Sequence, residues 1–224
     1  REAWKKTRVQ HINLLRGILR ELGVAAPSST QAFLRQACEL IERAEVCALR
    51  GALQMVLAEI SLCEQSMRDS EEQLARWHAD DDIVHKLDEV SGIGLLTASA
   101  LKTAVGKPER FASGRHLSAW LGMTPNEYSS GERRRLGCIS CKGNTYVRTL
   151  LIHGARAALL AAKRCQTRTP ERLTQLQRWA LQTAERIGHN KAAVALANKL
   201  VRICWAVWCH ERRFSGDWQS ARPA

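Results

Sequence analysis

The chain has 224 residues and carries 34 Lys and Arg against 22 Asp and Glu, which gives a formal net charge of +12. This length is sufficient for one large domain or two small ones with a hydrophobic core. The positive charge attracts phosphate groups and makes nucleic acid the first partner to consider. The eight cysteines lie mostly in apolar helical stretches without the compact spacing of a disulfide framework, which argues against an oxidised secreted protein.

The sequence shows neither a signal peptide nor a typical membrane span. It opens on the charged segment REAWKKTRVQ, and its most apolar run, 192–209, contains Asn198, Lys199 and Arg202. Such a run is predicted to be a buried helix. We therefore expect a cytoplasmic protein with no membrane partner. Because the first residue is Arg1 and not methionine, we also expect a processed or truncated piece of a longer protein.

Residues 1–82 are predicted to form a helical linker and coiled-coil region. Apolar residues recur at three- and four-residue steps over 4–22, a second helix is expected over 31–44, and a long one over 48–77. The long helix needs an apolar partner, which is either another helix of this chain or the same helix of a second copy. The second alternative predicts a homo-oligomer, a dimer or a tetramer.

Three adjacent aspartates, Asp80, Asp81 and Asp82, end this region. Consecutive residues point in different directions and no further ligands are spaced around them. A solvated turn with a helix N-cap is therefore favoured over a metal site, and we predict no metal ligands in this chain.

Residues 85–106 match a helix-hairpin-helix pattern, in which Gly92 and Gly94 flank Ile93 and Thr97 follows. The glycines allow a tight turn that leaves the first N–H groups of the second helix free to hold a DNA phosphate. We therefore predict that Gly92, Ile93, Gly94 and Thr97 bind nucleic acid. The alternative is a plain corner between two packed helices.

The remaining sequence is also predicted to be helical, around 114–121, after Asn144, over 170–184 and over 190–209. No segment alternates apolar and polar residues over a useful length, so we predict an all-α protein. The C-terminal domain is expected over 83–212, followed by a flexible tail over 213–224.

The segment 125–148, PNEYSSGERRRLGCISCKGNTYVR, concentrates the positive charge. Between Tyr128 and Arg172 there are ten Lys and Arg against two Glu. A patch this dense favours contact with a phosphate backbone. The residues that we predict to bind nucleic acid here are Arg133, Arg134, Arg135, Lys142, Asn144 and Arg148.

The same segment offers two kinds of chemistry. Cys138 and Cys141 form half of a zinc site, but no second close pair follows, which disfavours zinc. Ser129 and Ser130 precede a glycine and are by default turn residues. Alternatively, one of them attacks a phosphodiester while the arginines stabilise charge on phosphorus, although no Asp or His is obviously paired with it.

Four stretches carry a resemblance to a known family: VSGIGLLTASAL, RFASGRHLSAWLGMTP, YSSGERRRLGCISCKGNTYVRTLLIHGARA and GHNKAAVALANKLVRICWAV. Together they resemble the C-terminal half of DEDD-type insertion-sequence transposases, the IS-one-ten family with its IS-eleven-eleven branch, related to the Piv DNA invertase. The resemblance is dense over 84–207 and looser before it.

The resemblance implies a recombinase with an N-terminal RuvC-like nuclease domain that binds Mg²⁺, a helical middle and a C-terminal domain with a nucleophilic serine. The motif position of that serine falls on Ser130, with Ser129 as the fallback. The implied partners are DNA, at element ends and target, and a guide non-coding RNA. The implied location is the nucleoid of a prokaryotic cell.

Two departures from the family pattern affect the expected activity. The chain begins within the helices that normally follow the RuvC-like domain, so we expect it not to be a complete transposase by itself. Cys138 and Cys141 stand where the family commonly has basic or small residues, which further disfavours zinc. Two other functions are also considered: a non-catalytic helix-hairpin-helix module that grips DNA, and a decayed transposase remnant.

Overall fold

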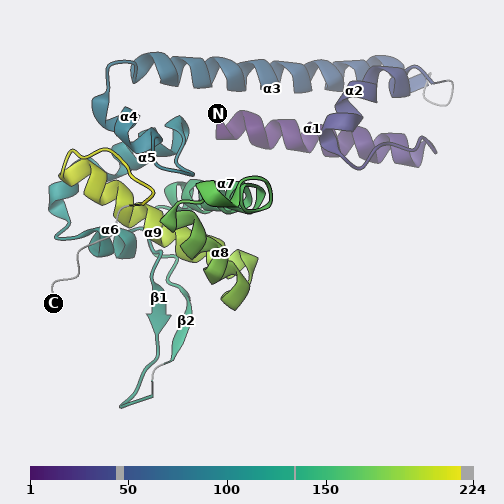
Figure 1. Ribbon diagram of the computed structural model, residues 1–224. Helices are drawn as coiled ribbons and strands as arrows, with labels where there is room; N and C mark the ends of the chain where they lie inside the picture. Colours follow the sequence, from purple (N-terminus) through teal and green to yellow (C-terminus); the bar gives the residue numbers. More distant parts are fainter. Residues whose placement is uncertain (44–47, 134, 218–224) are drawn as a thin grey trace. The chain divides into compact units, whose positions relative to one another are not determined.

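A computed structural model describes residues 1–43, 48–133 and 135–217 of the chain. Apart from one short hairpin, the regular elements in these ranges are helices, so the prediction of an all-α fold is confirmed (Figure 1). The chain divides into two compact units, 1–77 and 78–224, and a separate hydrophobic core lies in each of them.

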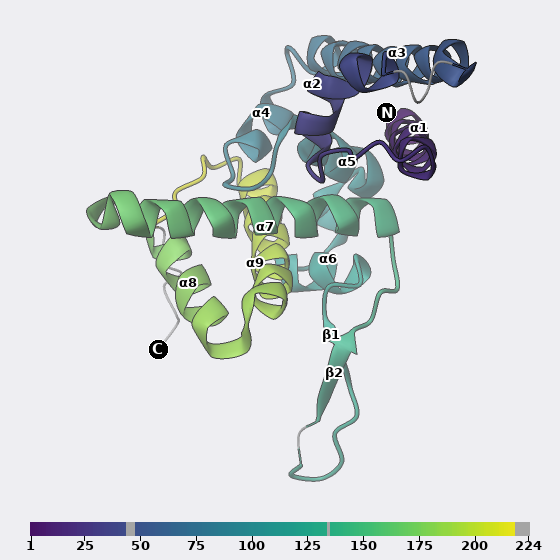
Figure 2. The same cartoon turned by 90° about the vertical axis from the view of Figure 1, so that its right-hand side faces the viewer.

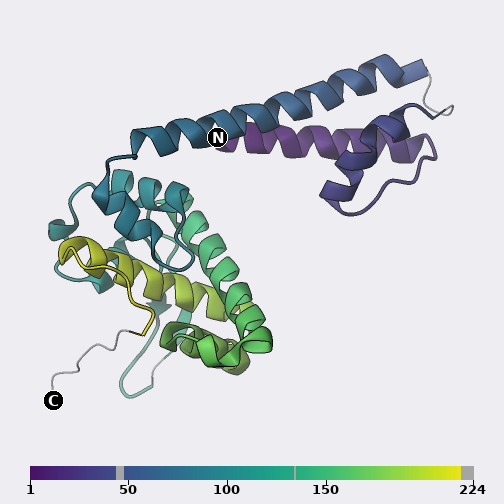
Figure 3. The same ribbon diagram turned by 45° about the horizontal axis from the view of Figure 1, so that its top comes forward.

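The first unit contains α1 (Glu2–Glu21), α2 (Thr30–Ile41) and α3 (Arg50–Trp77). α1 runs antiparallel beside α3, and α2 lies near the end where the two are connected (Figure 3). The core of this unit consists of Val24 and of helical residues that recur at three- and four-residue steps: Ile12, Leu15, Leu19, Phe33, Ala37, Leu40, Ile41, Leu53 and Ile60. The three helices predicted from this spacing are therefore confirmed.

The long helix α3 has its apolar partner within the chain. Leu53 and Ile60 are each 1% exposed in the core shared with α1. Beside that apolar contact, Arg8 of α1 pairs with Glu64 of α3 at 2.7 Å. The structure thus shows the first of the two predicted alternatives, packing of α3 within the chain. A coiled coil with a second copy stays a prediction.

The second unit contains six α-helices in its described part. These are α4 (Asp82–Asp88), α5 (Leu95–Val105), α6 (Gly114–Trp120), α7 (Thr145–Arg168), α8 (Gln175–Ile187) and α9 (His189–Cys209). Short 3₁₀ turns lie at Pro108–Arg110 and Pro170–Arg172. α9 contacts α4, α6, α7 and α8, which makes it the central helix of this unit (Figure 2).

The helix α9 is long and apolar enough to cross a membrane, with a mean hydropathy of 1.4 over its most apolar window, half of which is buried inside the protein. Leu196, Leu200 and Cys204 are at most 2% exposed. The core helix of a helical domain has the same composition, and its contacts with four other helices account for the apolar character of α9.

The corner before α4 bears out the expected turn and N-cap in the aspartate run. Asp81 is the N-cap residue of α4, and its Oδ1 accepts a hydrogen bond from Val84 N at 3.2 Å. An N-cap carboxylate satisfies one of the free N–H groups of the first helical turn.

A two-stranded antiparallel hairpin, which the sequence patterns did not predict, lies in the basic segment. Its strands are β1 (Pro125–Glu127) and β2 (Leu136–Ile139), with Pro125 opposite Ile139 and Glu127 opposite Leu136. Three or four residues are too few to give a recognisable period-two pattern. The hairpin projects away from the helices of its unit (Figures 1 and 2).

The predicted tail over 213–224 is described only as far as Asp217. Gly216 O accepts from Leu176 N at 3.0 Å, and Asp217 Oδ1 accepts from Gln175 N at 2.8 Å. This part of the predicted tail therefore caps the first turn of α8, whereas 218–224 lie outside the described residues.

Candidate nucleic-acid interface

The base of the hairpin is anchored on the end of α6. Cys141 N donates to Gly122 O at 3.2 Å, and Ser140 N donates to Thr124 O at 2.8 Å. Gly122 has a φ of +71°, and a Cβ here or at Gly143 would collide with the backbone that faces it. The two glycines thus let the returning chain pass close to the end of α6, which fixes where the hairpin leaves the domain.

Ser129 is held by the hairpin itself. Its Oγ donates to Glu127 Oε1 at 2.7 Å and accepts from Arg135 N at 3.0 Å. These two hydrogen bonds link β1 to the start of β2, and they engage both the proton and a lone pair of the hydroxyl. Ser129 therefore has a structural role in this hairpin.

Ser130 differs from its neighbour. Its backbone pairs with Arg133, with N–H donating to the Arg133 carbonyl at 3.3 Å and the carbonyl accepting from Arg133 N at 3.2 Å. The residue is exposed, and among the described residues its Oγ makes no hydrogen bond. Gly131 follows with a φ of +55° and makes the tight turn at the tip. The Ser130 hydroxyl is thus accessible, while the hydrogen bonds with Arg133 hold the Ser130 backbone in place.

The predicted basic residues divide into surface and buried positions. Arg133, Arg135 and Lys142 are exposed on or beside the hairpin, where their charges are free to meet a phosphate backbone. Arg134 lies outside the described residues. Asn144 is exposed but serves as the N-cap of α7, with its Oδ1 accepting from Val147 N at 3.1 Å.

Arg148 is not where the prediction of a nucleic-acid contact requires it to be. It is 7% exposed, and its guanidinium donates to Leu121 O and to Thr145 Oγ1, each at 3.1 Å. These bonds join α7 to the carboxyl end of α6. We correct its assignment accordingly: Arg148 supports the base of the hairpin from inside the domain.

The predicted helix-hairpin-helix residues lie at the corner between α4 and α5. Gly92 has a φ of +88°, and a Cβ on it would lie 2.7 Å from Gly154 O of α7. Ile93 is 3% exposed and Thr97 is 7% exposed. Gly92, Ile93 and Thr97 thus serve packing inside the unit, whereas exposed Gly94, the N-cap of α5, is the part of the corner open to a phosphate.

Further exposed cations lie along α7. Arg156, Lys163, Arg164 and Arg168 are all exposed, while Leu151 and Leu159 of the same helix are fully buried in the core. α7 therefore buries an apolar face and presents positive charge to solvent, which extends the basic surface beyond the hairpin.

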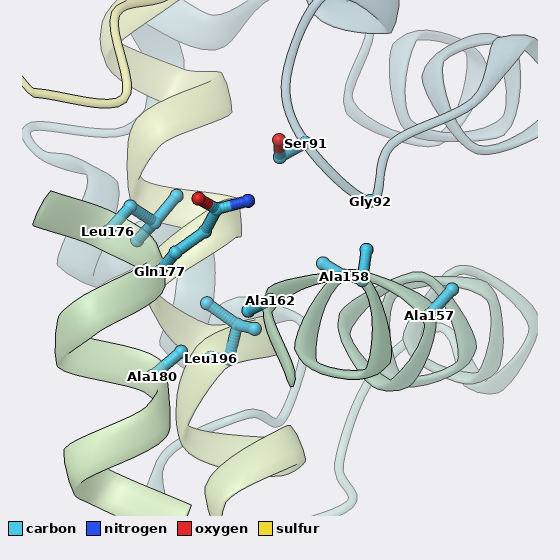
Figure 4. A pocket seen from close by; sticks show the side chains of 10 residues that line it. Ser91, Gly92, Ala157, Ala158, Ala162, Leu176, Gln177, Ala180 and Leu196 are labelled. Atoms are coloured by element: carbon cyan, nitrogen blue, oxygen red, sulfur yellow. The ribbon is translucent and has the colours of Figure 1, made fainter. Parts of the chain in front are cut away.

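A pocket of about 260 Å³ opens beside the α4–α5 corner (Figure 4). Two polar side chains, Ser91 and Gln177, line it together with small and apolar residues: Ala157, Ala158, Ala161, Ala162, Leu176, Ala180 and Leu196. The Gln177 Oε1 already accepts from Thr174 N at 3.0 Å in a capping box of α8. None of the lining residues is a cation.

A second polar cluster joins the start of the unit to α5. His78 lies with its Nδ1 3.1 Å from Asp81 Oδ2 and its Nε2 2.8 Å from Ser99 Oγ. This is the order of groups in a Ser-His-Asp triad, but Ser99 is 6% exposed inside α5, out of reach of a macromolecular substrate. Burial raises the pKa of Asp81, but hydrogen bonds from Lys102, Val84 N and His78 outweigh it and lower the pKa to about 2. The cluster therefore has a structural role, since it connects the segment before α4 to α5.

Sequence reasoning missed Gly154 and Gly137, which matter through contacts distant in sequence. Gly154 faces Gly92, and Gly137 faces the ring of Tyr128. The only signal in the sequence was an isolated glycine within a helix and another within the basic segment.

The exposed hairpin, with its cations and free serine hydroxyl, has the composition expected of a surface that faces nucleic acid. Residues 84–170, which include this hairpin, match the family described as "Transposase IS116/IS110/IS902 family". This part of the chain is therefore similar to the transposase domain of that family.

Curated relatives match nearly the whole chain. It is 35% identical to the "Probable family 20 transposase" of Pseudomonas aeruginosa over 92% of this chain and 60% of the relative. It is 33% identical to the "Transposase for insertion sequence element IS1111A" of Coxiella burnetii, over 96% of this chain and 58% of the relative. The transposase of element IS1328 from Yersinia enterocolitica is 31% identical, over 96% and 62%. The chain thus spans about three fifths of the length of these relatives.

Proposed function

We propose that this chain is the DNA-binding and recombination part of a transposase, in which the Ser130 hydroxyl attacks a DNA phosphodiester. The observation that carries this proposal is the difference between two adjacent serines. The Ser129 hydroxyl is engaged by Glu127 and by Arg135 N, whereas Ser130 is exposed at the tip beside Arg133. A nucleophile has to be accessible, which favours Ser130.

The proposed step exchanges one ester bond for another. Ser130 Oγ loses its proton and bonds to phosphorus, one bridging P–O bond of the DNA breaks, and the departing oxygen takes up a proton in exchange. Negative charge grows on the phosphoryl oxygens during this exchange, and guanidinium groups such as those of Arg133 and Arg135 are suited to stabilise it. The hairpin thus brings the nucleophile and the charge-stabilising groups to one tip.

Serine is a weak nucleophile and needs a base or a metal ion for activation. Among the described residues, no group of three or more His, Cys, Asp or Glu side chains could hold a metal ion, so these residues do not fit Mg²⁺ and we assign no step to a metal held by this chain. We propose instead that an acidic, Mg²⁺-binding RuvC-like domain outside the chain supplies the activation. The greater length of the curated relatives is compatible with such a domain.

The proposed partner is DNA, at the ends of an element and at its target, held by backbone contacts along the basic hairpin and α7. A guide RNA would meet the same basic surface through the same phosphate chemistry. We further propose that the active assembly contains two or four copies, since strand exchange joins two DNA sites. Gly94 at the amino end of α5 adds N–H donors to the phosphate-binding surface.

A recombination assay tests the role of Ser130. This chain replaces the matching part of the Coxiella burnetii relative, and strand cleavage at that element's ends is measured with Ser130→Ala, Ser129→Ala and unchanged versions. We expect Ser130→Ala to abolish cleavage while leaving DNA affinity unchanged. Ser129→Ala weakens the hairpin tip but keeps the nucleophile, so cleavage is reduced and not lost. Full cleavage by the Ser130→Ala version would refute the proposal and leave a DNA-binding module without this chemistry.

A further inference from the structure

Tyr128 occupies an unusual place in the hairpin. It follows the last residue of β1, and its N–H donates to Arg135 O at 2.8 Å, which fixes its backbone against the opposite strand. Its side chain is nevertheless 68% exposed. A large aromatic side chain on a basic, projecting hairpin contributes little to the core of the domain and calls for another explanation.

The ring of Tyr128 is supported on one side by the opposite strand. A Cβ at Gly137 would lie 2.9 Å from Tyr128 Cε2 and 3.6 Å from Cδ2. The Cδ2–Cε2 edge of the ring therefore lies against Gly137, at a distance that leaves no room for a side chain there. Because Gly137 has no side chain, the ring can approach the opposite strand closely. Tyr128 is highly exposed, so much of its ring stays open to solvent.

The position of this ring relative to Ser130 follows from the alternation of an extended chain. Successive residues point to opposite faces of a strand, so Tyr128 and Ser130 are expected on one face, about 7 Å apart along the chain. The hydrogen bond between Ser129 and Glu127 joins the two alternate residues of the other face, in agreement with this pattern. We therefore expect the ring about one nucleotide's length from the proposed nucleophile.

Base stacking requires an exposed, immobilised aromatic face close to groups that hold the phosphate backbone. Tyr128 provides the face, and exposed Arg133, Arg135 and Lys142 provide the charges. We propose that Tyr128 is a stacking platform for an unpaired nucleobase next to the phosphate presented to Ser130. This inference rests on the proposed function, because it places the platform within the same nucleic-acid-binding hairpin.

The platform gives the hairpin a preference for unpaired nucleic acid. In an intact duplex each base is already stacked between its neighbours, so Tyr128 gains nothing from it. A base freed at a melted or nicked site has an open face, and stacking on Tyr128 would hold the adjacent phosphate in place. Bases of DNA and of RNA present the same kind of aromatic face, so the experiment below distinguishes between the two sources.

The test uses the 224-residue chain with fluorescent 2-aminopurine placed in single-stranded DNA, in the matching duplex and in single-stranded RNA. Tyr128→Phe keeps the ring, while Tyr128→Leu removes it and keeps an apolar side chain. We expect Tyr128→Leu to bind single strands about 5- to 100-fold more weakly and to lose 2-aminopurine quenching, with duplex affinity unchanged. Tyr128→Phe should stay within about twofold of the unchanged chain, because the hydroxyl takes no part in stacking.

Two further variants separate the possible failures. In Gly137→Ala the added methyl group displaces the Tyr128 ring, so single-strand binding should weaken as it does in Tyr128→Leu. A triple Gln variant of Arg133, Arg135 and Lys142 tests the charge-based proposal itself. If that variant loses affinity while Tyr128→Leu binds single strands normally, the platform is wrong and the proposed function stands. If the unchanged chain binds none of the three probes, both are wrong. A loss confined to the DNA or the RNA arm identifies the source of the base.

Discussion

Gly92 of the α4–α5 corner and Gly154 of α7 cross with their backbones in direct contact. A Cβ on Gly92 would lie 2.7 Å from Gly154 O, and one on Gly154 would collide with Gly92 O. These residues come from opposite sides of the hairpin in sequence. Their contact therefore joins the α4–α5 corner to α7, the helix that follows the hairpin.

Gly154→Ala is expected to destabilise the second unit by about 1 to 3 kcal/mol, because the added methyl group forces apart two packed backbones. Urea unfolding followed by circular dichroism measures the change. Gly17→Ala is the matched control, since a Cβ on Gly17 in α1 has nothing within 4 Å and should stabilise its helix by up to about 1 kcal/mol. Equal stability of both variants would contradict the close crossing.

Arg148→Met is expected to destabilise the fold by about 1 to 3 kcal/mol, because it leaves the buried Leu121 carbonyl without its donor. DNA affinity per folded molecule should change little. Arg156→Met, at an exposed position of the same helix, should do the reverse, with normal stability and weaker binding. Thermal unfolding and fluorescence anisotropy together separate the two, and an Arg148→Met variant of normal stability would count against the buried role.

The hydrogen-bonded cluster of His78, Asp81 and Ser99 predicts a loss of stability in acid. The pKa of Asp81 is lowered from 3.8 to about 2 in the folded state, so the unfolded chain binds more protons between these values. The contribution is fully present above about pH 5 and is lost as the pH falls through about 2, and it amounts to about 1 to 2 kcal/mol. Urea unfolding of the unchanged chain and of Asp81→Asn should therefore differ at pH 6 and converge near about pH 2. A difference that persists at the acidic end would argue against this origin.

Binding of duplex DNA should weaken steeply with salt, and the hairpin cations should set part of that dependence. Each phosphate contact that is removed lowers the slope of log K against log salt by about 0.9. Replacement of Arg133, Arg135 and Lys142 by Gln should thus reduce the slope by about 2 to 3. An unchanged slope would move the DNA contact elsewhere, for example to the cations of α7.

The helices were predictable because their apolar residues repeat at helical spacing, as Leu53 and Ile60 do in α3. An N-cap within the run of three aspartates also followed from local chemistry, and the structure places it at Asp81. The hairpin was missed because its strands are too short to show alternation and are fixed by contacts at Gly122 and Gly143 that arise only in the folded domain. Arg148 was misplaced because a charged residue in a basic segment is expected at the surface, and its partner Leu121 is distant in sequence.

A covalent bond between Ser130 and DNA is the most direct test of the proposed nucleophile. The chimaera with the Coxiella burnetii relative is incubated with element-end DNA, digested with nuclease and protease, and analysed by mass spectrometry. We expect a nucleotide attached to Ser130, which disappears in Ser130→Ala and persists in Ser129→Ala. An adduct on Ser129, or cleavage with no adduct on either serine, would contradict it.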